Sequence, residues 1–163
     1  MKNNRHGQGK ILSPEELKLL FTEGLTSPRD RALFAICLFT GCRISEALAL
    51  QTTDIKSGTI TFRKSTTKGK LKTRVVDIQP ALAAFLDEYQ PKPGALFPGM
   101  RGVTEHLTKF MAHKILVKAC DRLWRLSFAQ SRHVSRCQYT FVSTYYINYN
   151  VFCWLSLAAY LGN

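Results

Sequence analysis

Acidic residues are scarce in this chain of 163 residues, which has 11 Asp and Glu against 23 Lys and Arg. The formal net charge of +12 makes the folded chain repel itself unless a polyanion offsets the charge. Nucleic acid is therefore the partner class that the composition favours. A ribosomal-type protein, a membrane-surface protein and a basic surface without a specific partner are the alternatives. With 45% hydrophobic residues, the chain still has the composition of a globular protein with its own core.

Cysteine pairs with metal-ligand spacing are absent. The five cysteines are odd in number, and no two stand in C-x-x-C spacing. None of the four histidines has metal-ligand spacing to a cysteine either. Cys37 and Cys42 lie in apolar, helix-like sequence. These features argue against a disulfide framework or a zinc site, and they predict reduced core thiols in a cytosolic protein without a metal or cofactor.

The chain also lacks a recognisable signal peptide. Residues 1–10 are polar and basic and contain no apolar core segment, so we interpret them as a flexible basic arm. Residues 139–161 are uncharged and long enough to span a bilayer, but Asn148, Asn150 and several Ser and Thr dilute their hydrophobicity. We therefore expect no membrane segment.

Several start and stop signals predict helices. Ser13-Pro14-Glu15-Glu16 combines an N-cap, a first-turn proline and a capping box, and Ser27-Pro28 repeats the signal before a buried apolar run that ends at Gly41. We expect further helices over about 42–50, over 80–89, and from Thr104 to about Leu123. The inner face predicted for the last helix consists of Leu107, Phe110, Met111, Ile115 and Leu116.

Two β-prone segments, 59–63 and 73–78, flank a polar stretch that is rich in lysine and carries one glycine. This pattern predicts a β-hairpin with a cationic tip over residues 64–72. Together with the helices, it predicts an α+β fold that is mainly helical and has a small antiparallel hairpin or sheet.

The sharpest motif is Thr40-Gly41-Cys42-Arg43-Ile44-Ser45-Glu46-Ala47-Leu48. An arginine at a helix start faces the positive end of the helix dipole, which is mildly unfavourable. Such a position suits a residue that grips phosphate, because guanidinium binds oxyanions bidentately and nearby backbone N–H groups add to the attraction. The alternative for an isolated residue of this kind is an ordinary solvated arginine.

This stretch closely resembles the box I motif of tyrosine recombinases of the phage-integrase type, T-G-x-R-[IV]-[SN]-E-[AL]-x-x-L. The following Leu50-Gln51-Thr52-Thr53-Asp54-Ile55 resembles the family's L-x-W-x-D-[IV], and the resemblance extends from Leu12 to about Arg122. It implies the family's catalytic-domain fold and site-specific DNA recombination or integration, in which strands are exchanged through a phosphotyrosine link without metal or ATP. It also implies a bacterial, cytoplasmic and nucleoid-associated protein.

The resemblance implies roles for individual residues. Arg43 corresponds to the first catalytic arginine, and Glu46 to a structural residue of the same box. The family's hairpin lysine acts as general acid, and Lys68, followed by Arg74-Val75-Val76, matches its pattern best, with Lys70 second. His133 and Arg136 fit the H-x-x-R of box II, although the residues from Cys137 onward do not match its continuation.

The resemblance divides the chain into the basic arm (1–10), the N-terminal two-thirds of the catalytic domain (11–126) and an atypical tail (127–163). The tail contains no Asp, Glu or Lys, so we interpret it as a frame-shifted or rearranged box II region. Family spacing would place the nucleophilic tyrosine near position 168, and we therefore assign none. We also expect a stand-alone catalytic domain with weak DNA affinity, because only about ten residues precede the resemblance.

Three functions stay open at this point. The chain is an active recombinase, a catalytically dead DNA-binding remnant or competitor of a full-length recombinase, or a basic structural protein associated with nucleic acid. For the first two we expect double-stranded DNA as partner and self-association on DNA. We expect no membrane partner and no small-molecule ligand.

Overall fold

The helices and strands of the protein come from a computed structural model, which describes residues 12–63, 73–99 and 102–129. Five α-helices are described: α1 (Pro14–Leu19), α2 (Pro28–Thr40), α3 (Ile44–Leu48), α4 (Pro80–Tyr89) and α5 (Lys109–Ala129). Two short helical turns are η1 (Leu20–Gly24) and η2 (Thr52–Asp54). The strands are β1 (Ile55–Lys56), β2 (Thr59–Phe62), β3 (Arg74–Asp77), β4 (Pro98–Gly99) and β5 (Gly102–His106).

The predicted capping box at the N-terminus is present. The Glu16 N–H donates to Ser13 Oγ over 3.2 Å, and the Ser13 N–H donates to Glu16 Oε2 over 3.0 Å. Two backbone donors that a helix start leaves without partners are thus satisfied. The helix continues through η1, a π-helical turn, and so extends further than α1 alone.

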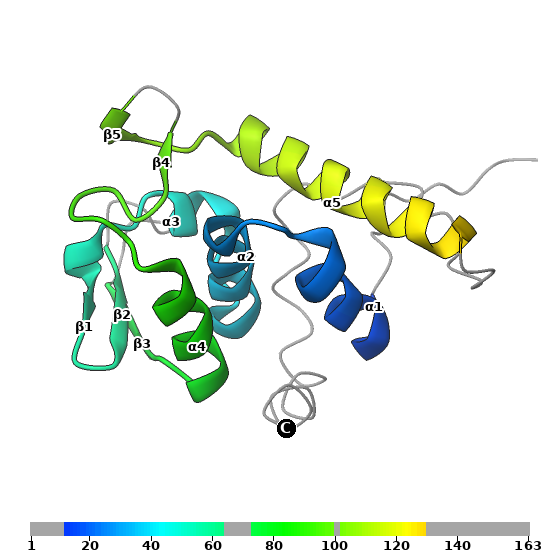
Figure 1. Cartoon of the computed structure of the whole chain (residues 1–163). Coiled ribbons are helices and arrows are strands. Elements are labelled where there is room, and N and C mark those ends of the chain that lie inside the picture. Colours follow the sequence, from blue (N-terminus) through cyan, green and yellow to red (C-terminus); the bar gives the residue numbers. More distant parts are fainter. Residues whose placement is uncertain (1–11, 64–72, 100–101, 130–163) are drawn as a thin grey trace, which may run out of the picture.

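Helix α2 lies at the centre of the described fold, with the sheet and α4 on one side and α5 and α1 on the other (Figure 1). Its apolar run accounts for the position, because Ala32, Leu33, Ala35 and Ile36 are completely buried. Gly41 ends the helix as predicted, in the left-handed conformation that glycine adopts without strain.

The strands β1, β2 and β3 form one antiparallel sheet in that order, and β4 pairs with β5 in a second. In the first sheet, Ile60 faces Val76 and Phe62 faces Arg74. Strands β2 and β3 confirm the two predicted β segments, whereas the short strand β1 was not predicted. The mainly helical α+β fold with a small antiparallel sheet is therefore confirmed.

Helix α5 corrects the prediction for residues 104–123. Thr104 belongs to β5, and the helix starts only at Lys109. The buried stripe of the helix contains Ala112, Leu116 and Ala119. Of the predicted inner face, Leu107 and Leu116 are buried and Met111 and Ile115 pack partly buried against the core, whereas Phe110 is 64% exposed. At 3.6 residues per turn, position 110 lies roughly opposite that buried stripe.

Helix α5 runs across the molecule past α2 and α1 (Figure 1). Arg122 Nη1 donates to the Gly24 carbonyl over 2.6 Å and so fastens the helix to η1. Within the described residues, no helix combines the length and the apolar character needed to cross a membrane.

Candidate functional site

The turn between α2 and α3 presents Arg43. Gly41 has φ 62° and ψ 20°, which reverses the chain directly after the last residue of α2. Thr40 Oγ1 donates to the Ile36 carbonyl over 2.7 Å and accepts the Cys42 N–H over 3.3 Å. These contacts fix the turn, so that Arg43 is the N-cap of α3, directly before its first helical residue, Ile44, and not within the first turn as predicted.

Glu46 holds Arg43 at two points. The Arg43 N–H donates to Glu46 Oε2 over 3.0 Å, and Arg43 Nη1 lies 3.4 Å from Glu46 Oε1. The Glu46 side chain is only 7% exposed, whereas that of Arg43 is 23% exposed. A buried carboxylate therefore orients a guanidinium that still reaches the surface, which agrees with a structural part for Glu46.

A second arginine, Arg74 from β3, reaches the same carboxylate. Arg74 Nη2 lies 3.8 Å from Glu46 Oε2, and Arg74 Nη1 donates to the Thr40 carbonyl over 3.2 Å. Its guanidinium carbon lies 4.6 Å from the centre of the Phe62 ring, within the range of a cation–π contact. We call Arg43, Glu46 and Arg74 the arginine cluster. Two guanidinium cations share one carboxylate, so the cluster keeps a net positive charge.

Cys37 and Cys42 lie beneath this turn as free, buried thiols, as predicted. A hydrogen bond with Cys42 and burial raise the pKa of Cys37. The same hydrogen bond lowers the pKa of Cys42 against the effect of burial. Both thiols pack as core residues below the turn.

At the base of the predicted hairpin, Asp54 anchors the end of strand β2, which pairs with the strand β3 that carries Arg74. Arg63 Nε donates to Asp54 Oδ1 over 2.9 Å, and Asp54 Oδ2 accepts the Gln51 N–H over 2.8 Å. Burial tends to raise the pKa of Asp54, but hydrogen bonds from Arg63 and Gln51 and the charge of Arg63 lower it below its usual value. Asp54 thus fastens the end of β2 from which the chain enters residues 64–72.

Only one of the four residues predicted to be catalytic is described. Lys68, its alternative Lys70, His133 and Arg136 all lie outside the described residues. The structure brings Arg43 together with Glu46 and Arg74, and the last of these was not recognised as a site residue. The signal for Arg74 was present, because Arg74-Val75-Val76 is part of the stretch whose match to the family suggested Lys68.

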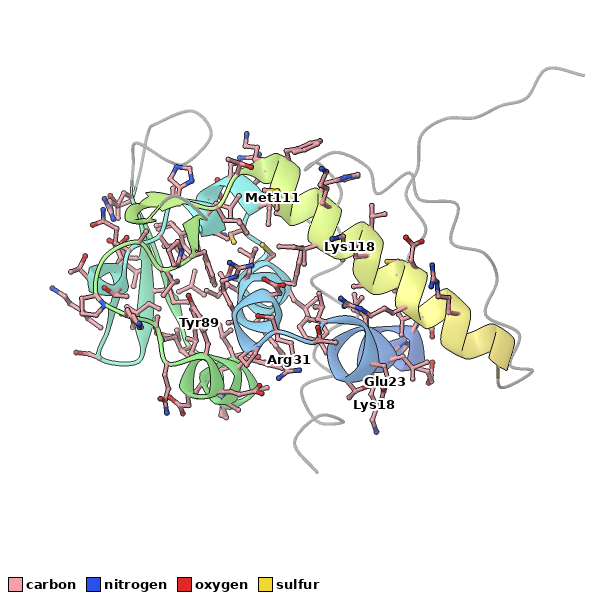
Figure 2. All side chains as sticks on the ribbon, turned by 45° about the horizontal axis from the view of Figure 1, so that its top comes forward. Lys18, Glu23, Arg31, Tyr89, Met111 and Lys118 are labelled. Carbon is pink, nitrogen blue, oxygen red and sulfur yellow. The ribbon has the colours of Figure 1, made fainter. Side chains whose placement is uncertain are left out.

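The outer face of α5 adds positive charge to the described surface. Six of its basic residues are exposed: Lys109, His113, Lys114, Lys118, Arg122 and Arg125. Asp121 is the one acidic residue of this helix. Exposed Phe110 lies among them, and Lys114 Nζ is 4.5 Å from the centre of its ring. Figure 2 shows Lys118 on this helix.

The chain is similar to two proteins of Sinorhizobium fredii (strain NBRC 101917 / NGR234), y4eF and y4qK, whose names mark them as candidate integrases/recombinases. Each is 36% identical over 129 residues, which is 77% of this chain. The aligned part is 50% of y4eF and 41% of y4qK, so the chain spans about half the length of these relatives. No family model matches the sequence.

The fold is similar to that of XerH, a site-specific recombinase solved in a pre-cleavage complex with its difH substrate. The TM-score is 0.50 at 25% sequence identity, over 77% of this chain and 38% of XerH. The sequence comparison and the fold comparison thus both find similarity to recombinases.

Proposed function

Because the chain belongs to the tyrosine recombinase family, we propose that it binds double-stranded DNA and grips a backbone phosphate with Arg43. One observation carries the proposal: Arg43 is the N-cap of α3, oriented by the buried carboxylate of Glu46 and only partly covered. The arginine cluster stays cationic, and a cationic, pre-oriented guanidinium is the group that recognises phosphate best.

The exposed basic residues of α5 are the second element of the proposed DNA surface. Helix α3 packs against α5, so Arg43 and the basic face belong to adjacent elements. A helix face of this kind contacts phosphates along a groove and sets the orientation of the protein on the duplex. The net charge of +12 supports the same partner.

As the reaction of this catalytic domain we propose site-specific recombination or integration of DNA. In that reaction a tyrosine hydroxyl attacks the scissile phosphorus and the 5′ oxygen leaves, so that a 3′-phosphotyrosine forms. Arg43 would stabilise the extra negative charge of the transition state, with Arg136 as the second arginine. Lys68, or Lys70 in its place, would protonate the leaving oxygen, and His133 would complete the box II pair.

The salt dependence of DNA binding tests the Arg43 proposal. The affinity of the full chain for a 30-base-pair duplex is measured by fluorescence anisotropy between 50 and 300 mM salt. We expect a dissociation constant in the micromolar range or weaker, and Arg43→Ala should reduce the log–log slope by about 0.9, the loss of one phosphate contact. An unchanged slope in Arg43→Ala contradicts the proposal.

Lys18→Ala is the matched control, because it also removes one positive charge. Figure 2 shows the Lys18 side chain on α1, pointing away from α5. It should leave the slope unchanged. An equal loss in both variants would mean that only the total charge of the chain matters.

A DNA-binding module without cleavage is the second candidate function. It is favoured by residues 127–163, where the sequence after His133-Val134-Ser135-Arg136 departs from the family pattern and contains no Asp, Glu or Lys. Nicked suicide duplexes from a random-sequence library distinguish the two functions. A covalent adduct that survives denaturant identifies an active recombinase, whereas salt-sensitive binding without any adduct supports the module.

A further inference from the structure

Arg74 is anchored more firmly than a surface arginine requires. Its guanidinium stacks on Phe62, bonds the Thr40 carbonyl and approaches Glu46, so it reaches both ends of the segment from Thr40 to Glu46. Nη2 is buried and makes no hydrogen bond within the described part of the chain, and it lies 3.8 Å from Glu46 Oε2, at ion-pair distance. A DNA phosphate cannot reach a buried nitrogen, which argues against direct DNA contact by this atom.

We propose that Arg74 is a positioning residue for Arg43, acting through Glu46 and the Thr40 carbonyl. This inference rests on the proposed phosphate contact of Arg43. Without Arg74, the Glu46 carboxylate has Arg43 as its remaining cation in the arginine cluster, and the pair is neutral. With Arg74 present, the carboxylate is shared, and Arg43 is oriented without losing its net attraction for phosphate.

The Thr40 contact contributes the second part of the positioning. Thr40 is the last residue of α2, where helix carbonyls lack partners within the helix. A bond from Arg74 to this carbonyl ties the turn that carries Arg43 to strand β3. Because an error of about 1 Å in a phosphate-binding group costs much of its effect, a tie of this kind matters for function as well as for stability.

A double-mutant cycle on the full chain tests the proposal. Arg74→Met keeps much of the aliphatic stem on Phe62 and removes the guanidinium. In the wild-type background it should weaken duplex binding about fivefold or more, and in the Arg43→Ala background less than about twofold, because contacting residues in one network are coupled. Equal weakening in both backgrounds, or none in either, overturns the proposal.

Arg74→Lys separates geometry from charge. Lysine keeps the positive charge but cannot reach the Thr40 carbonyl and Glu46 together. The variant should bind duplex at least about threefold more weakly than wild type, measured at a temperature where both are fully folded. Wild-type binding by Arg74→Lys would mean that charge alone suffices and that Arg74 has no positioning role.

Arg31→Lys is the matched control. Arg31 also combines a backbone carbonyl with a carboxylate, since Nη1 donates to the Leu25 carbonyl over 3.0 Å and the guanidinium pairs with Glu88. It lies in the first turn of α2, at the opposite end from Arg43, and is labelled in Figure 2. The control should alter thermal stability and leave DNA affinity unchanged.

A readout without DNA distinguishes this inference from the proposed function. The Nε–H signal of Arg43 in ¹H–¹⁵N spectra, assigned by its loss in Arg43→Ala, should move toward the free-arginine position in Arg74→Met and stay in place in Arg31→Lys. If wild type does not bind DNA but the signal moves, the proposed function fails and the positioning role stands. If the signal stays in place in Arg74→Met, the positioning role is wrong.

Discussion

Replacing Glu46 by glutamine should destabilise the fold, and the structure gives the size of the effect. Glu46 accepts the Arg43 N–H over 3.0 Å, and its two oxygens lie 3.4 Å from Arg43 Nη1 and 3.8 Å from Arg74 Nη2. Glutamine fills the same volume and keeps one carbonyl oxygen for the backbone N–H. Glutamine has no negative charge. Its NH2 group would also place hydrogen-bond donors next to the donors of two guanidinium groups.

The loss has two parts. A hydrogen bond to a charged group contributes roughly 1 kcal/mol more than a neutral one, which is the part lost at the Arg43 N–H. The ion pairs add about 1 kcal/mol, a figure discounted for solvent because the Arg43 and Arg74 side chains are 23% and 41% exposed. Glu46→Gln should therefore lower the free energy of unfolding by about 2 kcal/mol. For a chain of this size that corresponds to a melting temperature lower by roughly 4–8 °C.

Urea unfolding followed by far-UV circular dichroism measures the difference. Glu88→Gln is the control, because Glu88 pairs with Arg31 but its side chain is 46% exposed. It should cost less than about 1 kcal/mol, as exposed ion pairs do. If Glu46→Gln costs no more than Glu88→Gln, the cluster does not depend on the buried carboxylate, and the reasoning is refuted.

Three further predictions follow from local contacts. The lowered pKa of Asp54 means that its pair with Arg63 contributes stability above the unfolded-state pKa, about 4, and that this contribution is lost as the pH falls through the lower folded-state pKa. Acid titration of stability should be shallower below pH 4 in Asp54→Asn, and an identical profile contradicts the assignment. Gly41→Ala should cost about 1 kcal/mol in urea unfolding, because φ is 62° there, and an unchanged midpoint would rule out the left-handed turn. Ser13→Ala should cost about 1 kcal/mol by removing the N-cap oxygen of α1, whereas Thr22→Ala, on the exposed side of η1, should cost less.

Local signals in the sequence predicted most of the helical elements. Ser13 and Glu16 form their capping box, Pro28 opens α2, and Gly41 closes it. These signals act through hydrogen bonds and backbone angles within a few residues, so the order of amino acids contains all the information they need. The same holds for strands β2 and β3, whose β-prone segments flank the turn signal.

The error at residues 104–123 has a different cause. Strand β5 forms because its backbone pairs with β4, a contact that no helical period can indicate. That pairing delays the start of α5 to Lys109, and Phe110 then faces outward.

The sequence by itself determined the family resemblance, the position of Arg43 and the excess of positive charge, because these are properties of residue type and spacing. Only the tertiary structure decided that Arg74 shares Glu46 with Arg43. The two arginines are separated in the chain by α3, η2 and strands β1 and β2, and they meet because β3 lies beside the end of α2, where Arg74 bonds Thr40. Long-range packing of this kind sets which charges become neighbours, and so it sets whether an arginine near a helix start is solvated or held in place.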